Sequence, residues 1–133
     1  MDHEHTRLAL GPLAERPHVA FALSILGQPG SADLIPTPAA VLDLDAFDRN
    51  VAQMAARAQA ASLALRPHAK SHKSAALARR QMAAGAVGVC CAKLAEAEAL
   101  AAAGIGHILV TSPISGPMAA ARAARLAAAA PDF

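Results

Sequence analysis

Basic side chains are concentrated in one short stretch of this chain, the run RPHAKSHK at residues 66–73. A lysine in such a cluster differs from an ordinary surface lysine, because neighbouring positive charge and partial burial both disfavour its ammonium form. More of the free amine then exists near neutral pH, and the free amine is the form that condenses with a carbonyl group to give a Schiff base. Lys70, in the middle of the run, is the candidate for this chemistry.

The pattern around this run places it where a strand ends and a helix begins. If residues 63–70 form a strand, its alternation puts Arg66, His68 and Lys70 on one face and apolar residues on the other. A helical pattern starts at Ala75, so the cluster adjoins a helix N-terminus, where free backbone N–H groups attract anions. Two other interpretations remain open, a solvated edge and an anion-binding loop without covalent chemistry.

The composition indicates one globular domain and argues against nucleic acid as a partner. The chain has 133 residues, of which 55% are hydrophobic, and this is ample for a core. The formal net charge is only +2, and the chain has three Phe, no Trp and no Tyr. So few aromatic rings leave little for base stacking, and the charge is too balanced for a nucleic-acid surface.

The positions of the cysteines and the length of the apolar runs favour a cytoplasmic location for the protein. The two cysteines, Cys90 and Cys91, are adjacent and therefore poorly placed to bridge each other, so we expect both to pack in the core. The longest apolar run near the N-terminus, residues 19–26, is far too short to span a bilayer. We expect a cytoplasmic protein with no membrane partner.

An irregular leader followed by alternating strands and helices is predicted along the chain. Residues 1–34 have no clear period apart from one short ordered segment at 19–26, which leaves 35–133 as the domain. The predicted strands cover residues 40–44, 63–70, 87–92 and 105–111. The predicted helices cover residues 45–61 with Asp45 as N-cap and Asp43 facing solvent, 74–84 between Ser74 and Gly85, 94–103, and 118–130.

The alternation from residue 63 onward predicts an α/β fold with a parallel sheet and right-handed crossovers. Two architectures fit, an open doubly wound sheet and a partial (β/α)8 barrel of three βα units preceded by a strand and a helix. No GxGxxG motif follows a strand, so the dinucleotide-binding fingerprint is missing from the sequence. In both architectures functional groups belong at the carboxyl ends of the strands, which here carry Lys70, Lys93 and the pair Thr111-Ser112.

Four segments carry a family resemblance. They are TPAAVLDLDAFDRNV (37–51), LRPHAKSHKS (65–74), GVCCAKLAEAEALAAAGI (88–105) and ILVTSPISGP (108–117). Together they resemble the N-terminal part of the D-threonine aldolase and D-serine dehydratase family, which are pyridoxal-phosphate enzymes of the alanine-racemase-like fold type. The resemblance implies the barrel alternative, as an incomplete alanine racemase N-terminal-like domain. It also implies that Lys70 is the lysine that binds pyridoxal 5'-phosphate covalently.

The resemblance further implies a lyase acting on a small β-hydroxy-D-amino acid. An aldolase would give glycine and an aldehyde, whereas a dehydratase would give a keto acid and ammonia, and both possibilities stay open. In the family a divalent metal assists as a Lewis acid, with ligands from a C-terminal β-domain, and complete members form homodimers. We therefore expect this chain to be an N-terminal fragment that is inactive alone and has no metal ligands of its own.

The roles of the other residues in the run are left open by the sequence. His68 and His72 are expected either to contact the cofactor or to be structural hydrogen-bonding groups. Arg66 is expected either to act electrostatically on the cofactor or to form a salt bridge, and Lys73 to face solvent. A different class of protein also remains open, a non-catalytic pyridoxal-phosphate-binding homeostasis protein, which uses a strand-end lysine as well.

Overall fold

The computed structural model describes residues 15–130, and the chain divides into two compact units, Met1–Leu42 and Asp43–Phe133. The first unit contains helix α2 (Pro17–Ile25) and a short 3-10 helix, η2 (Ser31–Leu34). Helix α2 corresponds to the ordered segment expected within the leader, and the rest of that leader, residues 1–14, lies outside the described residues. The boundary between the units falls after residue 42. The division into a leader of residues 1–34 and a domain of residues 35–133 stays a prediction.

The strand expected at residues 40–44 is wrong. Residues 40–43 have no regular structure, and helix α3 (Leu44–Ala60) already begins at the last residue of the predicted strand. Asp43 rather than Asp45 is the N-cap, because its carboxylate accepts the N–H of Ala46 at 2.9 Å. A strand needs a partner for its backbone groups, and the described residues offer this segment none, whereas the Asp43 side chain satisfies a free N–H at the start of a helix.

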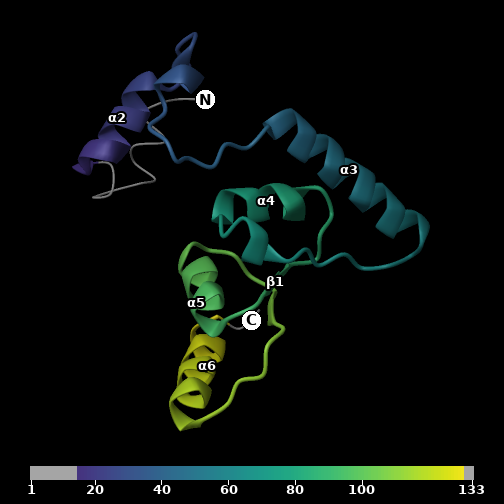
Figure 1. Cartoon of the computed structure of the whole chain (residues 1–133). Helices are drawn as coiled ribbons and strands as arrows, with labels where there is room; N and C mark the ends of the chain where they lie inside the picture. The colour runs from purple at the N-terminus through teal and green to yellow at the C-terminus, as the bar shows by residue number, and fades with distance from the viewer. Residues whose placement is uncertain (1–14, 131–133) are drawn as a thin grey trace. The chain divides into compact units, whose positions relative to one another are not determined.

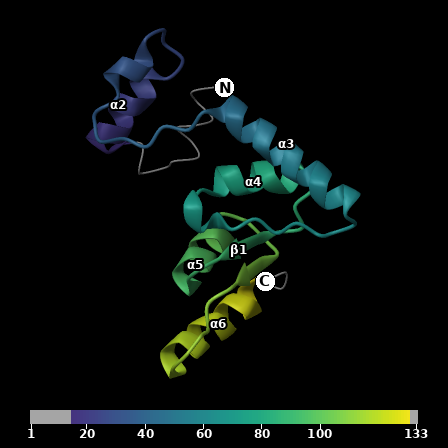
Figure 2. The ribbon, with the colours of Figure 1, turned by 45° about the vertical axis from the view of Figure 1, so that its right-hand side comes forward.

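Two parallel strands and one extended segment form the centre of the second unit (Figure 2). Strand β1 (Val89–Cys91) pairs in parallel with strand β2 (Ile108–Val110). On the other side of β1 lies the extended segment 63–68. It is bonded to the β1 side of the sheet by Val87 N to Leu65 O at 2.9 Å, by Cys90 N to Pro67 O at 2.7 Å, and by a parallel bridge between His68 and Cys90. The spatial order is therefore extended segment, β1, β2.

The extended segment is shorter and less regular than the expected strand at residues 63–70. Pro67 has no N–H to donate to a ladder, which weakens strand pairing at its centre. The chain then turns into the 3-10 helix η3 (Ala69–Ser71). The alternation of a strand consequently holds only as far as His68, and Lys70 lies in a turn beyond the sheet.

A helix follows the extended segment and each of the two strands, as an α/β fold predicts (Figure 1). These helices are α4 (Ala75–Ala83), α5 (Leu94–Ala102) and α6 (Pro117–Ala129). The Ser74 hydroxyl accepts the N–H of Leu77 at 3.4 Å, so the N-cap predicted for α4 is confirmed. Arg122 on α6 forms an ion pair with Glu98 on α5, and this pair ties the last two helices together.

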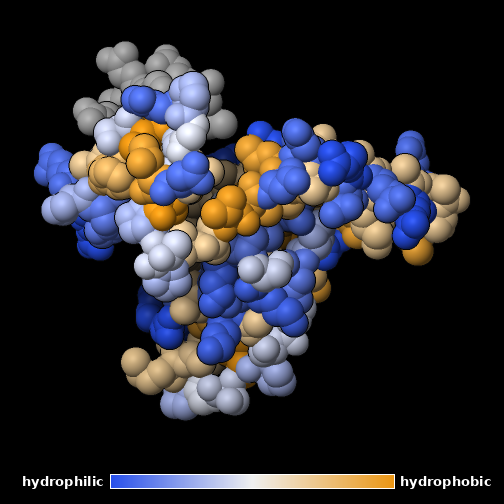
Figure 3. All heavy atoms as spheres, turned by 45° about the horizontal axis from the view of Figure 1, so that its top comes forward, coloured by the Kyte–Doolittle hydropathy of each residue, from blue (hydrophilic) through white to orange (hydrophobic). Residues whose placement is uncertain are grey.

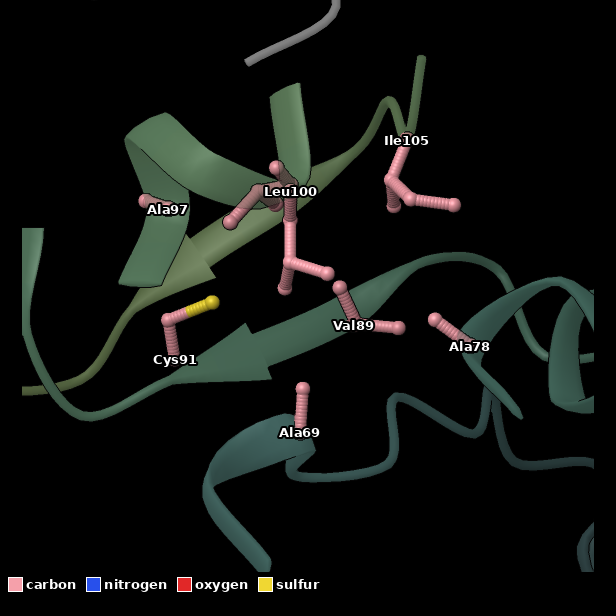
Figure 4. Close-up of a cluster of buried hydrophobic side chains, with 8 residues drawn as sticks. Ala69, Ala78, Val89, Cys91, Ala97, Leu100 and Ile105 are labelled. Carbon is pink, nitrogen blue, oxygen red and sulfur yellow. The ribbon is translucent and has the colours of Figure 1, made fainter. Parts of the chain in front are cut away.

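The core of the second unit is small and lies against one face of the sheet (Figure 4). Val89 and Cys91 are fully buried on that face of β1. The other buried members of the cluster are Ala69, Ala78, Ala97, Leu100, Ile105 and Ile108. Ala78 on α4 and Ala97 on α5 allow these helices to approach β1 closely, and the larger side chains of Leu100, Ile105 and Ile108 complete the core.

The opposite face of the sheet is not covered by the described helices. Leu109 at the centre of β2 is 50% exposed, while its neighbour Ile108 on the core side is 5% exposed. In Figure 3 hydrophobic residues reach the surface among hydrophilic ones. Within residues 15–130, the helices are too short or too polar to cross a membrane.

Candidate functional site

The uncovered face of the sheet carries the candidate site. Residues in register on neighbouring parallel strands point to the same side, so His68, Cys90 and Leu109 share this face. Alternation adds Arg66 and Thr111, each two positions away from one of these residues. The face therefore collects two of the predicted site residues, Arg66 and His68, together with one member of the predicted strand-end pair.

Hydrogen bonds tie together the carboxyl ends of the three parallel segments. His68 Nε2 lies 3.3 Å from Thr111 Oγ1, and the Thr111 hydroxyl donates to the Cys91 carbonyl oxygen over 3.1 Å. On the other side of the imidazole ring, His68 Nδ1 accepts the backbone N–H of Lys70 at 3.3 Å. His68 thus connects the end of β2 to the turn that carries Lys70.

Arg66 is bound at the opposite end of the same face. Its guanidinium passes beside Gly88 and donates a hydrogen bond to the carbonyl oxygen of His107, the residue before β2. The same carbonyl accepts the N–H of Val89 at 3.3 Å. Arg66 therefore connects the amino ends of the strands, and the structure does not bring it to Lys70.

Lys70 is exposed in the first turn beyond the extended segment. The partial burial expected from the sequence is therefore wrong for this chain. The backbone of the turn is nevertheless fixed, because the Ser71 hydroxyl donates to the His68 carbonyl at 3.3 Å and the His72 N–H donates to the Ala69 carbonyl at 3.2 Å. The lysine has a defined backbone at the carboxyl ends of the strands and a side chain open to solvent.

His72 stabilises the start of helix α4. Its Nδ1 accepts the N–H of Ser74 at 3.0 Å, and its Nε2 lies 3.2 Å from Gln81 Oε1. Both ring nitrogens are engaged within the protein. The geometry therefore favours the structural one of the two roles expected for His72.

Lys73 is largely exposed, as expected, but it is also ion-paired. Its side chain is 70% exposed, and its Nζ lies 3.5 Å from Glu96 Oε1. The other oxygen of Glu96 accepts the N–H groups of Ala92 and Lys93 at 3.0 and 3.4 Å. Desolvation alone raises the pKa of the Glu96 carboxyl, but these two N–H groups and the Lys73 ammonium together lower it more, so the pKa lies below that of an ordinary glutamate. Glu96 thus anchors the start of α5 beside η3.

Hollows adjoin these elements without containing the lysine. One of about 330 Å³ lies between α3 and the extended segment and is lined mainly by apolar side chains. Another, of about 410 Å³, lies near the starts of α4 and α5, and its lining includes Lys73, Lys93 and Glu96. A third, of about 630 Å³, lies between the second half of α3 and the start of the extended segment. Lys70 lines none of these three hollows. In this chain the candidate site lies at the carboxyl ends of the three parallel segments and is open to solvent.

The polar groups of the candidate site fit an aldehyde cofactor better than a metal ion. They comprise the primary amine of Lys70, the imidazole of His68 and the hydroxyl of Thr111. A primary amine is the group that binds a cofactor aldehyde covalently. Among residues 15–130, no three His, Cys, Asp or Glu side chains lie close enough together to hold a metal ion.

The role of Thr111 was missed by sequence reasoning, which placed this residue at a strand end and gave it no partner. The bond between Thr111 and His68 depends on the register of three parallel segments, and the two residues are 43 positions apart along the chain. Alternation along one segment cannot supply that register. The sequence did indicate that both residues lie near the carboxyl ends of predicted strands, and this was the one sign that they could meet.

Known proteins resemble this chain over most of its length. Residues 42–130 match the family model described as alanine racemase, N-terminal domain. The chain is 44% identical to a D-threonine aldolase of an Arthrobacter species over 108 residues, which are 80% of this chain and 28% of that protein. It is 45% identical over 93 residues to the 3-hydroxy-D-aspartate aldolase of Paracoccus denitrificans, covering 69% of this chain and 24% of that protein.

Solved structures give the same result. The crystal structure of D-threonine aldolase from Filomicrobium marinum superposes with a TM-score of 0.70 and 51% identity, over 72% of this chain and 26% of that one. The D-threo-3-hydroxyaspartate dehydratase from Delftia superposes with a TM-score of 0.66 and 42% identity, over 71% of this chain and 24% of that one. The chain spans about a quarter of the length of the relatives that it matches.

Proposed function

The chain belongs to the family of alanine racemase N-terminal domains, and from this we propose that it carries the cofactor lysine of a pyridoxal-phosphate-dependent lyase. The substrate class would be β-hydroxy-D-amino acids, and the reaction would be of the D-threonine aldolase type, giving glycine and an aldehyde. The observation that carries the proposal is the position of Lys70, an exposed amine on a fixed turn at the carboxyl ends of parallel strands. The similarity of the chain to two aldolases supports it.

We propose a separate role for each residue at or next to the candidate site. Lys70 would hold the cofactor, and His68 would keep the backbone of the lysine in place through its bond to the Lys70 N–H. Lys73 and Glu96 would fix the start of α5 next to the lysine turn. When bound, pyridoxal phosphate supplies an electron sink that allows a bond at the Cα of an amino acid to break. Arg66 and His72 are assigned no contact with the cofactor, because both are bonded elsewhere.

A partial (β/α)8 barrel is the architecture that we propose for the second unit. Three parallel segments, each followed by a helix, form a sheet whose core face is covered and whose other face is open. In a closed barrel the helices lie outside and the uncovered face lies inside, with functional groups at the carboxyl ends of the strands. Lys70, His68 and Thr111 occupy those ends.

A dehydratase is the second candidate, because the chain is 49% identical over 75 residues to the D-threo-3-hydroxyaspartate dehydratase of a Delftia strain. One solved structure of a variant of that enzyme is described as a metal-free form, which points to a metal in the dehydratase. The described residues of this chain do not fit a metal, so we assign the metal no step here.

A hybrid enzyme tests the proposed function. This chain would replace the segment of the Arthrobacter D-threonine aldolase that it matches, and circular dichroism and thermal unfolding would establish that the hybrid is folded. We expect release of glycine and an aldehyde from D-threonine, reduced roughly a thousandfold or more by Lys70→Ala and little changed by Lys93→Ala. Keto acid and ammonia as products would favour the dehydratase. A folded hybrid without either activity, or full activity after Lys70→Ala, would contradict the proposal.

A further inference from the structure

We infer that Thr111 is a positioning residue for Lys70, acting through His68. The Thr111 hydroxyl would hold the imidazole in one tautomer and one orientation, and the imidazole would hold the backbone N–H of the lysine. This inference rests on the proposed function for the chemistry of Lys70. The hydrogen bonds themselves are a property of the described structure.

The direction of each bond follows from the groups that can donate. The Lys70 backbone N–H is a donor, so His68 Nδ1 must be the unprotonated acceptor. In a neutral imidazole the proton is then on Nε2, which faces Thr111 Oγ1 at 3.3 Å. The hydroxyl accepts this proton and donates its own to the Cys91 carbonyl oxygen at 3.1 Å. All three bonds are satisfied together only by the Nε2–H tautomer of His68.

Thr111 is well fixed for this purpose. Its backbone N–H donates to the Cys91 carbonyl oxygen at 2.9 Å, and its hydroxyl donates to the same oxygen. Two bonds from one residue to one carbonyl leave the side chain little freedom, and the branched Cβ restricts its χ1 angle further. The Thr111 Oγ1 therefore offers a lone pair in a defined direction, and His68 meets it from the far side of β1.

Two cross-strand links span β1 on the uncovered face, one at each end. Arg66 bonded to the His107 carbonyl joins the amino ends, and His68 bonded to Thr111 joins the carboxyl ends. The second link lies beside Lys70, and its far partner belongs to a different strand. The hydrogen bond between His68 and Thr111 therefore makes the orientation of the lysine turn depend on the position of β2.

The experiment uses the 133-residue chain with ¹⁵N-labelled histidine, and the His68 signal is assigned with a His68→Gln variant. We expect an Nε2–H tautomer in the wild type and its loss or averaging with the other tautomer in Thr111→Val. Amide hydrogen exchange at Lys70 should become about fivefold faster in Thr111→Val, which is the effect of one hydrogen bond. Thr111→Ser should restore both properties, because it keeps the hydroxyl, and Ser112→Ala, at the exposed neighbour, should change neither.

The outcomes separate this inference from the proposed function. An Nδ1–H tautomer in the wild type would overturn the inference, and so would an unchanged tautomer and exchange rate in Thr111→Val. Failure of Thr111→Ser to restore the tautomer would also overturn it, since the hydroxyl would then not be the cause. Covalent labelling with pyridoxal phosphate and borohydride, measured on the same samples, tests the proposed function. A correct tautomer with no label on Lys70 would reject the function and leave the positioning role standing.

Discussion

At the scale of single residues, the candidate site depends on which side chains have partners. Arg66, His68 and His72 were predicted as one group around Lys70, but their hydrogen bonds separate them. Arg66 bonds a backbone carbonyl at the amino ends of the strands, and His72 bonds helix α4. Only His68 reaches the lysine, through the N–H of residue 70. The residue types were sufficient to find the basic cluster in the sequence. The role of each residue could be assigned only from its hydrogen-bond partners in the structure.

The two cysteines provide a prediction at this scale. Burial raises the pKa of the Cys91 thiol to about 11, and nearby Glu96 and Cys90 raise it as well. Only on the order of one Cys91 in a thousand is then a thiolate at pH 8. With iodoacetamide at pH 8 we expect alkylation of the partly buried Cys90 and sparing of the fully buried Cys91, as read by peptide mass spectrometry.

The unfolded chain is the control for this measurement, because both thiols should react there at similar rates. A Cys91→Ser variant should take up nearly as much label as the wild type in the native state. Equal alkylation of Cys90 and Cys91 in the folded chain would contradict the packing described for β1.

At the scale of elements, local signals predicted the helices better than the strands. Ser74 and the glycine at position 85 set the ends of α4 closely, since caps and left-handed glycines act within one turn. The predicted strand at 40–44 failed because a strand also needs a neighbour, and apolar alternation alone does not provide one. The segment at 63–68 has such a neighbour, but Pro67 and the turn at η3 make it irregular.

The junction between Arg66 and His107 gives a prediction about β1. A Cβ at Gly88 would overlap the His107 carbonyl oxygen and crowd the Arg66 guanidinium, and the φ of this glycine is 153°. Gly88→Ala should therefore lower the free energy of unfolding by about 3 kcal/mol or more, from steric overlap added to backbone strain. Gly104→Ala is the matched control, because its φ is 77° but nothing lies within 4 Å of the added Cβ.

The control variant should lower the free energy of unfolding by only about 1 kcal/mol, the effect of the left-handed backbone alone. Urea unfolding followed by circular dichroism measures both changes. Equal destabilisation by the two substitutions would show that the close approach at Gly88 has no energetic weight.

The contact between α5 and α6 gives a prediction about the stability of the fold at acidic pH. The hydrogen bond and charge of Arg122, with a further contribution from Arg125, hold the pKa of Glu98 below that of an ordinary glutamate. A carboxyl group whose pKa is lowered on folding stabilises the fold above its unfolded pKa, and this stabilisation is lost as the pH falls through the folded pKa. Stability should therefore decrease as the pH falls below about 4.

The matched variant for this test is Glu98→Gln, which keeps the size of the side chain and removes its titration. Its thermal unfolding midpoint should fall less between pH 6 and pH 3 than that of the wild type. The remaining decrease should come from other carboxyl groups, including that of Glu96, whose pKa is also lowered. An identical pH dependence in the two proteins would exclude Glu98 as a contributor.

At the scale of the whole molecule, the sheet has one face that the described helices cover and one face that they leave open. The covered face has a small core around Val89 and Cys91, and the open face carries His68, Leu109 and Thr111. The α/β class was predictable from the alternation of elements. The open face was not, because it depends on which parts of a sheet other elements cover.

The share of each relative that the chain covers leads to a prediction about activity. The chain matches 28% of the Arthrobacter aldolase and places its lysine in an exposed turn at the carboxyl ends of the strands. We expect the 133-residue chain alone to release no aldehyde from D-threonine in the presence of pyridoxal phosphate, with or without added divalent metal. An enzyme-coupled aldehyde assay measures this, with a complete D-threonine aldolase as the positive control. Turnover by the isolated chain that is lost in Lys70→Ala would contradict the prediction.

Covalent trapping tests the role of Lys70 most directly. The chain has three lysines, Lys70, Lys73 and Lys93, so the others serve as internal references. The chain would be incubated with equimolar pyridoxal phosphate, reduced with borohydride and analysed by peptide mapping. The account predicts that the pyridoxyl group is found mainly on Lys70, and that Lys70→Ala loses it without a matching gain at the other two. Preferential labelling of Lys73 or Lys93 in the wild-type chain would contradict the account.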